Sequence, residues 1–90
     1  MTEAEILAAV RQFVRDNFLY MKPGFVLDDD DSLLKKGVVD SMGVMEMLGF
    51  LEEKFGVSPD ENELTEANLG TTRAIAHFVS TKQAGGRTAG

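Results

Sequence analysis

Few side chains in this 90-residue chain have the chemistry of a catalytic centre. The chain contains one histidine, His77, and no cysteine. Without a thiol or a second histidine, a nucleophile and its base could be assembled only from carboxylates. The acidic residues are numerous but spread along the chain, and we expect His77 to lie on the solvent side of a helix. The sequence therefore argues against an enzyme, a disulfide framework and a cysteine-ligated metal site.

The run from Asp28 to Asp31 suggests calcium as a ligand. A calcium loop of the EF-hand type needs alternating oxygen ligands, a glycine at its sixth position and a glutamate at its twelfth. Counted from Asp28, these two positions hold Leu33 and Val39. The pattern fails, so we expect solvated, turn-forming carboxylates and no bound metal. A calcium-responsive regulator is the remotest hypothesis for the chain.

An amphipathic helix is predicted at the start of the chain. Thr2 and Glu5 form a capping-box pattern, and Pro23-Gly24 marks a break after the helix. Its apolar stripe recurs at three- and four-residue spacing: Ile6, Leu7, Val10, Phe13, Val14 and Phe18. Residues 20–39 then form a long connection, of a length that is usually functional or disordered. We expect it to pack at two apolar points, residues 25–27 and 33–34, with Asp30 or Asp31 capping a short helical turn through Ser32–Lys35.

A second helix is predicted from its N-cap, Asp40, to Phe55, with Gly56 as its stop. At about 100° per residue, one face is apolar and should be core: Val44, Met47, Leu48, Leu51 and Phe55. The opposite face holds Met42, Met45, Glu46, Gly49 and Glu53. Gly43 and Gly49 are both expected on the outward side, where either a partner approaches closely or the helix tolerates a cost of up to ~1 kcal/mol each.

The last third of the chain is predicted to form a short irregular stretch and a final helix. The pattern Ser58-Pro59-Asp60-Glu61 indicates a capped start, with Leu64 and Leu69 as buried candidates. Thr71 should cap a helix through about Thr81, whose inner face is Ala74, Ile75, Phe78 and Val79. Residues 1–82 are expected to form a single domain, and residues 83–90 a flexible tail. Since no segment alternates with period two, the predicted class is all-α: a four-helix bundle with three longer helices, one short helix and a long loop between helices one and two.

Charge and length limit the partners and the location. The net charge of −6 disfavours binding to nucleic acid and to anionic membranes, and basic protein surfaces are its natural complement. No apolar run approaches the ~20 residues that a membrane span needs, and the acidic N-terminus is unlike a signal peptide. We therefore expect a monomer in the cytoplasm that does not insert into membranes.

Two segments give the sequence a specific resemblance. The segment 33–42, LLKKGVVDSM, opens the second predicted helix, and the segment 51–56, LEEKFG, closes it. Together with the capped first helix, the long first loop and the pattern TTRAIAHFV of the last helix, they resemble the acyl carrier protein family over about residues 3–82. This resemblance implies that Ser41 carries a covalently attached 4′-phosphopantetheine arm. It also implies that Asp40 caps the helix and helps the modifying transferase to recognise the site.

The resemblance also implies a set of partners: a phosphopantetheinyl transferase, an acyl- or aminoacyl-adenylating ligase, and downstream transferases or synthases. Met42 stands where the family usually has leucine, and the run DSMG is similar to discrete carriers such as the D-alanyl carrier. The implied function is therefore delivery of acyl or aminoacyl thioesters in a secondary-metabolite pathway, of the polyketide or nonribosomal-peptide kind, or in aminoacyl transfer. A housekeeping fatty-acid carrier is the alternative within the family.

The outward face of the second helix is the predicted partner-binding surface, and we call Met42, Met45, Glu46, Gly49 and Glu53 the partner face. Exposed methionines suit binding to several partners because their side chains are flexible and polarisable. The alternative for Met45 is burial under the long loop. An alternative of another class also stays open: a non-covalent acidic adaptor, in which Ser41 only begins a helix and this face binds a basic partner.

Overall fold

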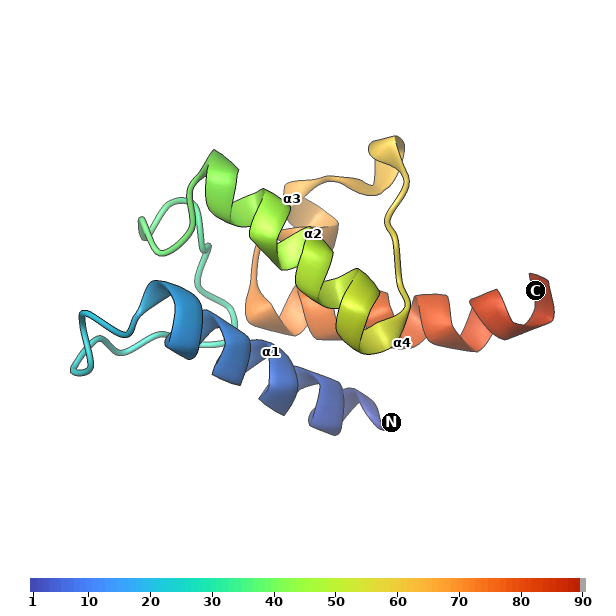
Figure 1. The fold of residues 1–90 in the computed structure, drawn as a ribbon, viewed down its shortest axis with the longest axis horizontal. Coiled ribbons are helices and arrows are strands. Elements are labelled where there is room, and N and C mark those ends of the chain that lie inside the picture. The colour runs from blue at the N-terminus through green and yellow to red at the C-terminus, as the bar shows by residue number, and fades with distance from the viewer. Residues whose placement is uncertain (90) are drawn as a thin grey trace.

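The chain folds as a bundle of helices around one apolar core (Figure 1). The computed structural model describes residues 1–89, and their side chains through residue 84. Its elements are α1 (Glu3–Phe18), α2 (Ser41–Phe55), the short 3₁₀ helix η1 (Glu61–Glu63), α3 (Glu66–Leu69) and α4 (Thr72–Ala89). No strand occurs within this part of the chain. The predicted class is confirmed: three longer helices, one short helix, and a long loop between α1 and α2.

The N-terminal helix forms as its sequence predicts. The Glu5 amide donates to Thr2 Oγ1 at 3.1 Å, and the Thr2 amide donates to Glu5 Oε1 at 2.7 Å, which completes the capping box. The hydrogen bond from the Thr2 backbone holds the pKa of Glu5 below its usual range. The inner stripe of α1 is buried at Ile6, Val10 and Val14.

The buried face of α2 is rotated from the predicted one, towards Gly43 and away from Val44 and Leu48. Met47, Leu51 and Phe55 are buried as expected, but the fourth buried residue is Gly43. Val44 and Leu48 are only half-buried, because they border a cavity beside α3 instead of filling the core. The prediction that Gly43 faces outward is therefore wrong.

Gly43 is buried because α2 begins directly against α1. A Cβ atom at this position would lie 2.9 Å from Phe18 Cε1 and 3.0 Å from Val39 Cγ1. Both distances are shorter than ordinary carbon contacts, so an added side chain would force Phe18, Val39 or α2 itself to shift. Gly49, in contrast, is exposed, and a Cβ there would meet nothing within 4 Å.

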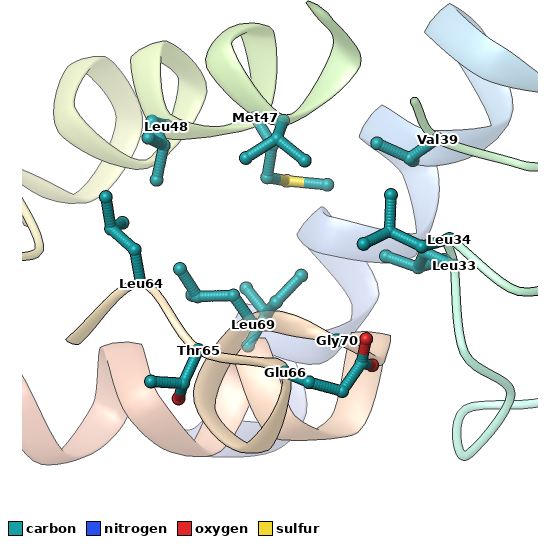
Figure 2. Close-up of a pocket in the computed structure, with 12 residues that line it drawn as sticks. Leu33, Leu34, Val39, Met47, Leu48, Leu64, Thr65, Glu66, Leu69 and Gly70 are labelled. Atoms are coloured by element: carbon teal, nitrogen blue, oxygen red, sulfur yellow. The ribbon is translucent and has the colours of Figure 1, made fainter. Parts of the chain in front are cut away.

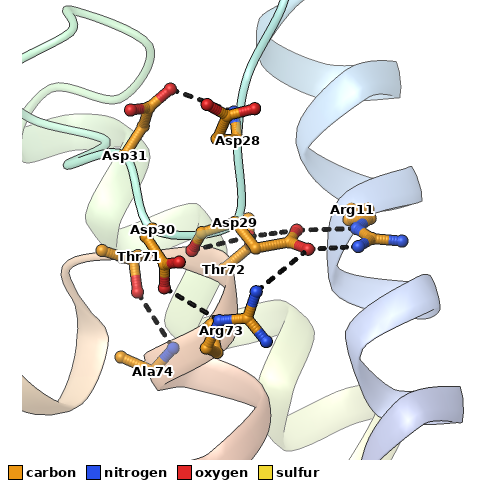
Figure 3. A network of polar contacts seen from close by, with 9 residues as sticks. All are labelled: Arg11, Asp28, Asp29, Asp30, Asp31, Thr71, Thr72, Arg73 and Ala74. Atoms are coloured by element: carbon orange, nitrogen blue, oxygen red, sulfur yellow. Dashed lines mark hydrogen bonds and ion pairs between the residues drawn. The ribbon is translucent and has the colours of Figure 1, made fainter.

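The long loop is fastened to two helices through Asp29 (Figure 3). Arg11 of α1 donates from Nε to Asp29 Oδ1 at 2.7 Å and also pairs with Oδ2. From α4, Thr72 Oγ1 donates to the same Oδ1 at 3.0 Å, and the Arg73 amide donates to the Asp29 carbonyl at 3.1 Å. The adjacent Asp30 accepts from Arg73 Nε at 2.8 Å.

These contacts correct the expectation that the whole run from Asp28 to Asp31 is solvated. The Asp29 side chain is only 13% exposed, and the Arg11 hydrogen bond holds its pKa below the usual range. Its charge is thus used inside the protein, to tie the loop to α1 and α4. Within the described side chains, no group of three or more histidine, cysteine, aspartate or glutamate residues is placed to hold a metal ion.

The second half of the loop is joined to α3 and to the start of α2 through Leu33. The Leu33 amide donates to the Gly70 carbonyl at 2.9 Å, and the Leu33 carbonyl accepts from the amides of Val38 and Val39 at 2.9 and 3.1 Å. The two predicted packing points are present in part: Phe25 and Leu27 are half-buried and Leu33 is buried, but Val26 and Leu34 are exposed. The turn at residues 32–35 is capped by Ser32, whose hydroxyl accepts from the Lys35 amide at 3.2 Å, and not by Asp30 or Asp31.

The segment before α3 differs from its predicted start. The capping box is formed by Asp60 and Glu63, two residues later than the Ser58–Glu61 pattern, and the Ser58 hydroxyl donates instead to Glu52. Leu64 was expected to be buried but is 45% exposed, because it lies at the edge of the same cavity as Leu48.

The last helix is capped as predicted but is longer. The Ala74 amide donates to Thr71 Oγ1 at 3.0 Å, and the helix continues to Ala89 instead of ending near Thr81. The buried residues of its inner face are Thr72, Ile75, Ala76, Phe78 and Val79, while Ala74 is half-buried. The flexible tail over residues 83–90 stays a prediction, and Gly90 lies outside the described residues.

His77 is exposed, with Nδ1 3.3 Å from Glu3 Oε1. Over the residues described, no helix combines the length and apolarity needed to cross a bilayer.

Candidate functional site

The hydroxyl of Ser41 lies at the start of a well-capped helix. Ser41 is the first residue of α2 and is exposed. The preceding Asp40 has extended backbone angles, and its Oδ1 accepts from the Gly43 amide at 2.8 Å. The predicted cap is therefore confirmed. Because the buried Gly43 fixes the first turn against α1, the position of the Ser41 side chain is set by the fold and not by a mobile loop.

The start of α2 suits a negatively charged group attached to Ser41. The first amides of a helix have no backbone acceptor within it. Here Asp40 Oδ1 accepts from the Gly43 amide, which leaves the amides of Ser41 and Met42. They and the positive end of the helix dipole favour a phosphate close by. The exposed hydroxyl leaves room for such a group, so the residues present fit a phosphodiester at this position.

The five residues of the partner face are all exposed, and they begin directly after Ser41. Met42 is 75% exposed and Met45 65% exposed. The alternative that Met45 folds under the long loop is therefore wrong. Glu46, Gly49 and Glu53 continue the surface along α2, next to the stacked rings of Phe13 and Phe50, whose centroids are 4.2 Å apart. Their role in partner binding stays a prediction.

A cavity opens on the other flank of α2, between this helix, α3 and the loop (Figure 2). Its volume is about 180 Å³. Most of its lining side chains are apolar: Leu33, Leu34, Val39, Val44, Met47, Leu48, Leu64, Leu69 and Ile75. Val39 and Val44 lie two residues before and three residues after Ser41, so the cavity begins within one helical turn of the exposed hydroxyl.

One charged side chain lines this apolar cavity, that of Glu66 at the start of α3. Sequence reasoning missed both the cavity and Glu66, because neither follows from the periodicity of a single element. The cavity exists where α2, a four-residue helix and an irregular loop meet. The feature of the sequence that could have indicated a cavity is the irregular stretch around Leu64. Its apolar residues do not belong to a long helix that would pack them fully.

Comparisons with known proteins point to one family. The sequence pattern of the family described as "Phosphopantetheine attachment site" matches residues 8–79. One similar protein is the D-alanyl carrier protein of Abiotrophia defectiva, which is 35% identical over 57 residues, or 63% of this chain and 72% of that protein. Members of the family act as carriers and not as catalysts, and they hold 4′-phosphopantetheine covalently. Because the match runs from α1 to α4, this chain belongs to the phosphopantetheine-attachment family of carrier proteins.

Proposed function

We propose that Ser41 is the residue that carries 4′-phosphopantetheine in this protein. The observation that carries the proposal is the exposed hydroxyl at the first position of α2, with Asp40 as the cap of that helix. When attached, the group supplies a terminal thiol on which an acyl or aminoacyl cargo is held as a thioester. Asp40 keeps the first turn in place, and the free amides of that turn favour the phosphodiester.

Ser41 does not activate itself. Its neighbours in the first turn are Asp40, whose Oδ1 is engaged by the Gly43 amide, and the apolar Met42. A phosphopantetheinyl transferase therefore supplies the base and the metal for the attachment. In this step the Ser41 oxygen bonds to the phosphorus that bears the pantetheine arm of coenzyme A, loses its proton to the transferase, and displaces the nucleotide bisphosphate. Asp40 is the proposed recognition residue for that enzyme.

The proposed cargo pathway is aminoacyl transfer or secondary metabolism of the polyketide or nonribosomal-peptide kind. The similarity to a D-alanyl carrier protein supports an aminoacyl cargo. In this proposal an adenylating ligase loads the arm, and downstream transferases or synthases unload it. They approach over the partner face, where Glu46 and Glu53 attract basic surfaces and the methionines supply apolar contact. The proposal places the carrier in the cytoplasm as a monomer; a fatty-acid pathway is the alternative.

The test is attachment of the arm in vitro. The protein is incubated with coenzyme A, magnesium and a broad-specificity phosphopantetheinyl transferase, and its intact mass is measured. We expect one phosphopantetheine per chain in the wild type and in Ser58→Ala, and none in Ser41→Ala. Ser41→Ala should change the unfolding free energy by less than ~0.5 kcal/mol, since the side chain is exposed. Modification that persists in Ser41→Ala would refute the assignment, and no modification of the wild type would favour the non-covalent adaptor.

A further inference from the structure

The chain makes a short exposed turn just before α2 begins (Figure 1). It consists of residues 34–37, which we call the basic turn because it carries Lys35 and Lys36. Both lysines are exposed, and neither forms an ion pair with any side chain that the structure describes. Other cationic side chains of the fold are held by carboxylates: Arg11, Arg73 and Lys82. The charge of the basic turn is therefore available to a partner.

The basic turn is held in one shape by hydrogen bonds of its own backbone. The amides of residues 35–39 all donate to atoms of residues 32–34, over distances of 2.9–3.2 Å. Gly37 has a φ of +72°, which glycine adopts at little cost, and it closes the turn. The Leu33 amide is bonded in turn to the Gly70 carbonyl at 2.9 Å. A protein that binds this turn would meet a surface that is already formed, so little backbone ordering would oppose binding.

The fold also fixes the basic turn relative to Ser41. Only residues 38–40 lie between them, and both Val38 and Val39 are buried. Val39 packs where α2 begins, since its Cγ1 atom is 3.0 Å from the place of a Cβ on Gly43. The lysines and the exposed Ser41 hydroxyl are thus presented on one rigid part of the surface.

Exposed charges of opposite sign flank Ser41. Glu46 and Glu53 follow it on α2, and Lys35 and Lys36 precede it on the basic turn. Although the whole chain carries a net charge of −6, its surface next to Ser41 is positive on the loop side. A partner with one basic and one acidic region can bind this surface in only one orientation, because the reversed orientation would bring like charges together.

One class of partner must cover the residues around Ser41. Enzymes that load or unload a cargo act at the thiol end of the arm, away from its point of attachment. A phosphopantetheinyl transferase, in contrast, must bring the phosphorus of coenzyme A to about 3–3.5 Å from the Ser41 oxygen. Its surface therefore has to lie close to the segments on both sides of Ser41, and the basic turn is one of them.

We propose that the basic turn is a docking site for the phosphopantetheinyl transferase, which binds Lys35 and Lys36 through acidic side chains of its own. This inference rests on the proposed attachment at Ser41. The exposed part of Leu34, whose side chain is 50% accessible, adds an apolar contact. The two lysines orient the carrier and take no part in the exchange of bonds at phosphorus.

The experiment measures docking and attachment with the transferase of the organism that encodes this chain. Lys35→Gln/Lys36→Gln removes the charge of the basic turn, and Lys35→Arg/Lys36→Arg keeps it. The matched control is Lys54→Gln/Lys82→Gln, at the end of α2 about 20 Å from Ser41. Each Gln pair removes two positive charges, so both change the net charge from −6 to −8. Circular dichroism checks that all the variants are folded.

Docking is measured by calorimetry without coenzyme A, in a Ser41→Ala background that cannot be modified. Attachment is measured by intact mass with Ser41 present. We expect the Kd for docking and the KM for the carrier to rise about two- to tenfold in Lys35→Gln/Lys36→Gln, the range for two exposed ion pairs. The kcat should not change, and the difference should shrink as salt is added. The Arg pair should behave as the wild type, and the control should change both constants by less than about twofold.

The outcomes separate this inference from the function on which it rests. If the wild type accepts no arm from this transferase or from a broad-specificity one, the proposed function fails, and docking fails with it. If the wild type accepts the arm but the Gln pair in the basic turn changes neither Kd nor KM, or changes them no more than the control pair does, attachment stands and the docking site is wrong. A higher KM with an unchanged Kd would mean that the lysines meet the phosphates of coenzyme A, and this too would overturn binding by acidic side chains.

Discussion

Replacing Gly43 by alanine tests how closely the beginning of α2 packs against α1. In the structure, the added methyl group would lie 2.9 Å from Phe18 Cε1 and 3.0 Å from Val39 Cγ1. Both neighbours are packed against other side chains. Val39 is 4% exposed, and the Phe18 ring is held edge-on by Phe13, with ring centroids 5.7 Å apart. The substitution therefore overfills a packed site.

Two opposing effects set the magnitude. Alanine favours a helix over glycine by up to ~1 kcal/mol, whereas an extra methyl group in a packed core usually costs about 1–3 kcal/mol. We expect overfilling to dominate, so that Gly43→Ala lowers the unfolding free energy by about 1 kcal/mol. Gly49→Ala is the matched control, because its methyl group meets nothing within 4 Å. The control should raise the unfolding free energy by about 0.5–1 kcal/mol.

Urea and thermal denaturation followed by circular dichroism measure both variants. For a domain of this size, 1 kcal/mol corresponds to a shift in Tm of about 4–8 °C, so the two variants should move in opposite directions by a resolvable amount. If Gly43→Ala stabilises the protein as much as Gly49→Ala does, the inference that α2 packs closely on α1 at Gly43 is wrong. Gly43→Ala should also slow attachment at Ser41, because the strain lies in the same helical turn.

The remaining predictions concern the loop and the partner face. Asp29→Asn should lower the unfolding free energy at pH 7 by about 1–3 kcal/mol. The folded state lowers the pKa of Asp29, so its contribution to stability is present above the ordinary aspartate pKa of about 4. This contribution is lost as the pH falls through the lower pKa of the folded state. The denaturation curves of the variant and the wild type should therefore converge in acid. Asp30→Asn should cost less than about 1 kcal/mol, because its ion pair is exposed; equal costs would mean that Asp29 is not the anchor. Glu46→Lys and Met45→Ala should slow loading by the cognate ligase without lowering Tm, and the charge reversal should flatten the dependence of the loading rate on salt. Unchanged loading together with unfolding of Met45→Ala would contradict the assignment of the partner face.

The elements that depend on local physics could be predicted from the sequence. The capping box of Thr2 and Glu5, the cap at Asp40 and the stop at Gly56 require only neighbours within a few residues, and all three are present. The exposure of Ser41, the proposed attachment residue, belongs to this class, because it follows from the place of Ser41 in the first turn of α2. Helical periodicity likewise gave the face of α1 that meets the core, of which Ile6, Val10 and Val14 are buried and the other predicted residues half-buried.

The features that depend on how elements meet could not be predicted in this way. Gly43 is buried because Phe18 and Val39 approach it, and no period within α2 contains that information. Asp29 differs from the neighbouring aspartates only through its contacts with Arg11 and Thr72, which are 18 and 43 residues away in the chain. The cavity arises from incomplete packing at a junction of three segments, so a pattern of apolar residues predicts filled core where the structure has space.

The hydrogen bonds of Leu33 connect the edge of the cavity at Gly70 to the backbone that leads into α2. Its amide is fixed to the Gly70 carbonyl, where α3 ends, and its carbonyl is fixed to Val38 and Val39, directly before the helix that begins at Ser41. Outward movement of α3 must therefore either break the first bond or pull on the residues that lead into α2. Since coupling between two sites is reciprocal, an enzyme that displaces the segment before Ser41 also lowers the free energy needed to open the cavity. A protein that binds where α2 begins and moves this segment would thus also loosen α3 at the edge of the cavity.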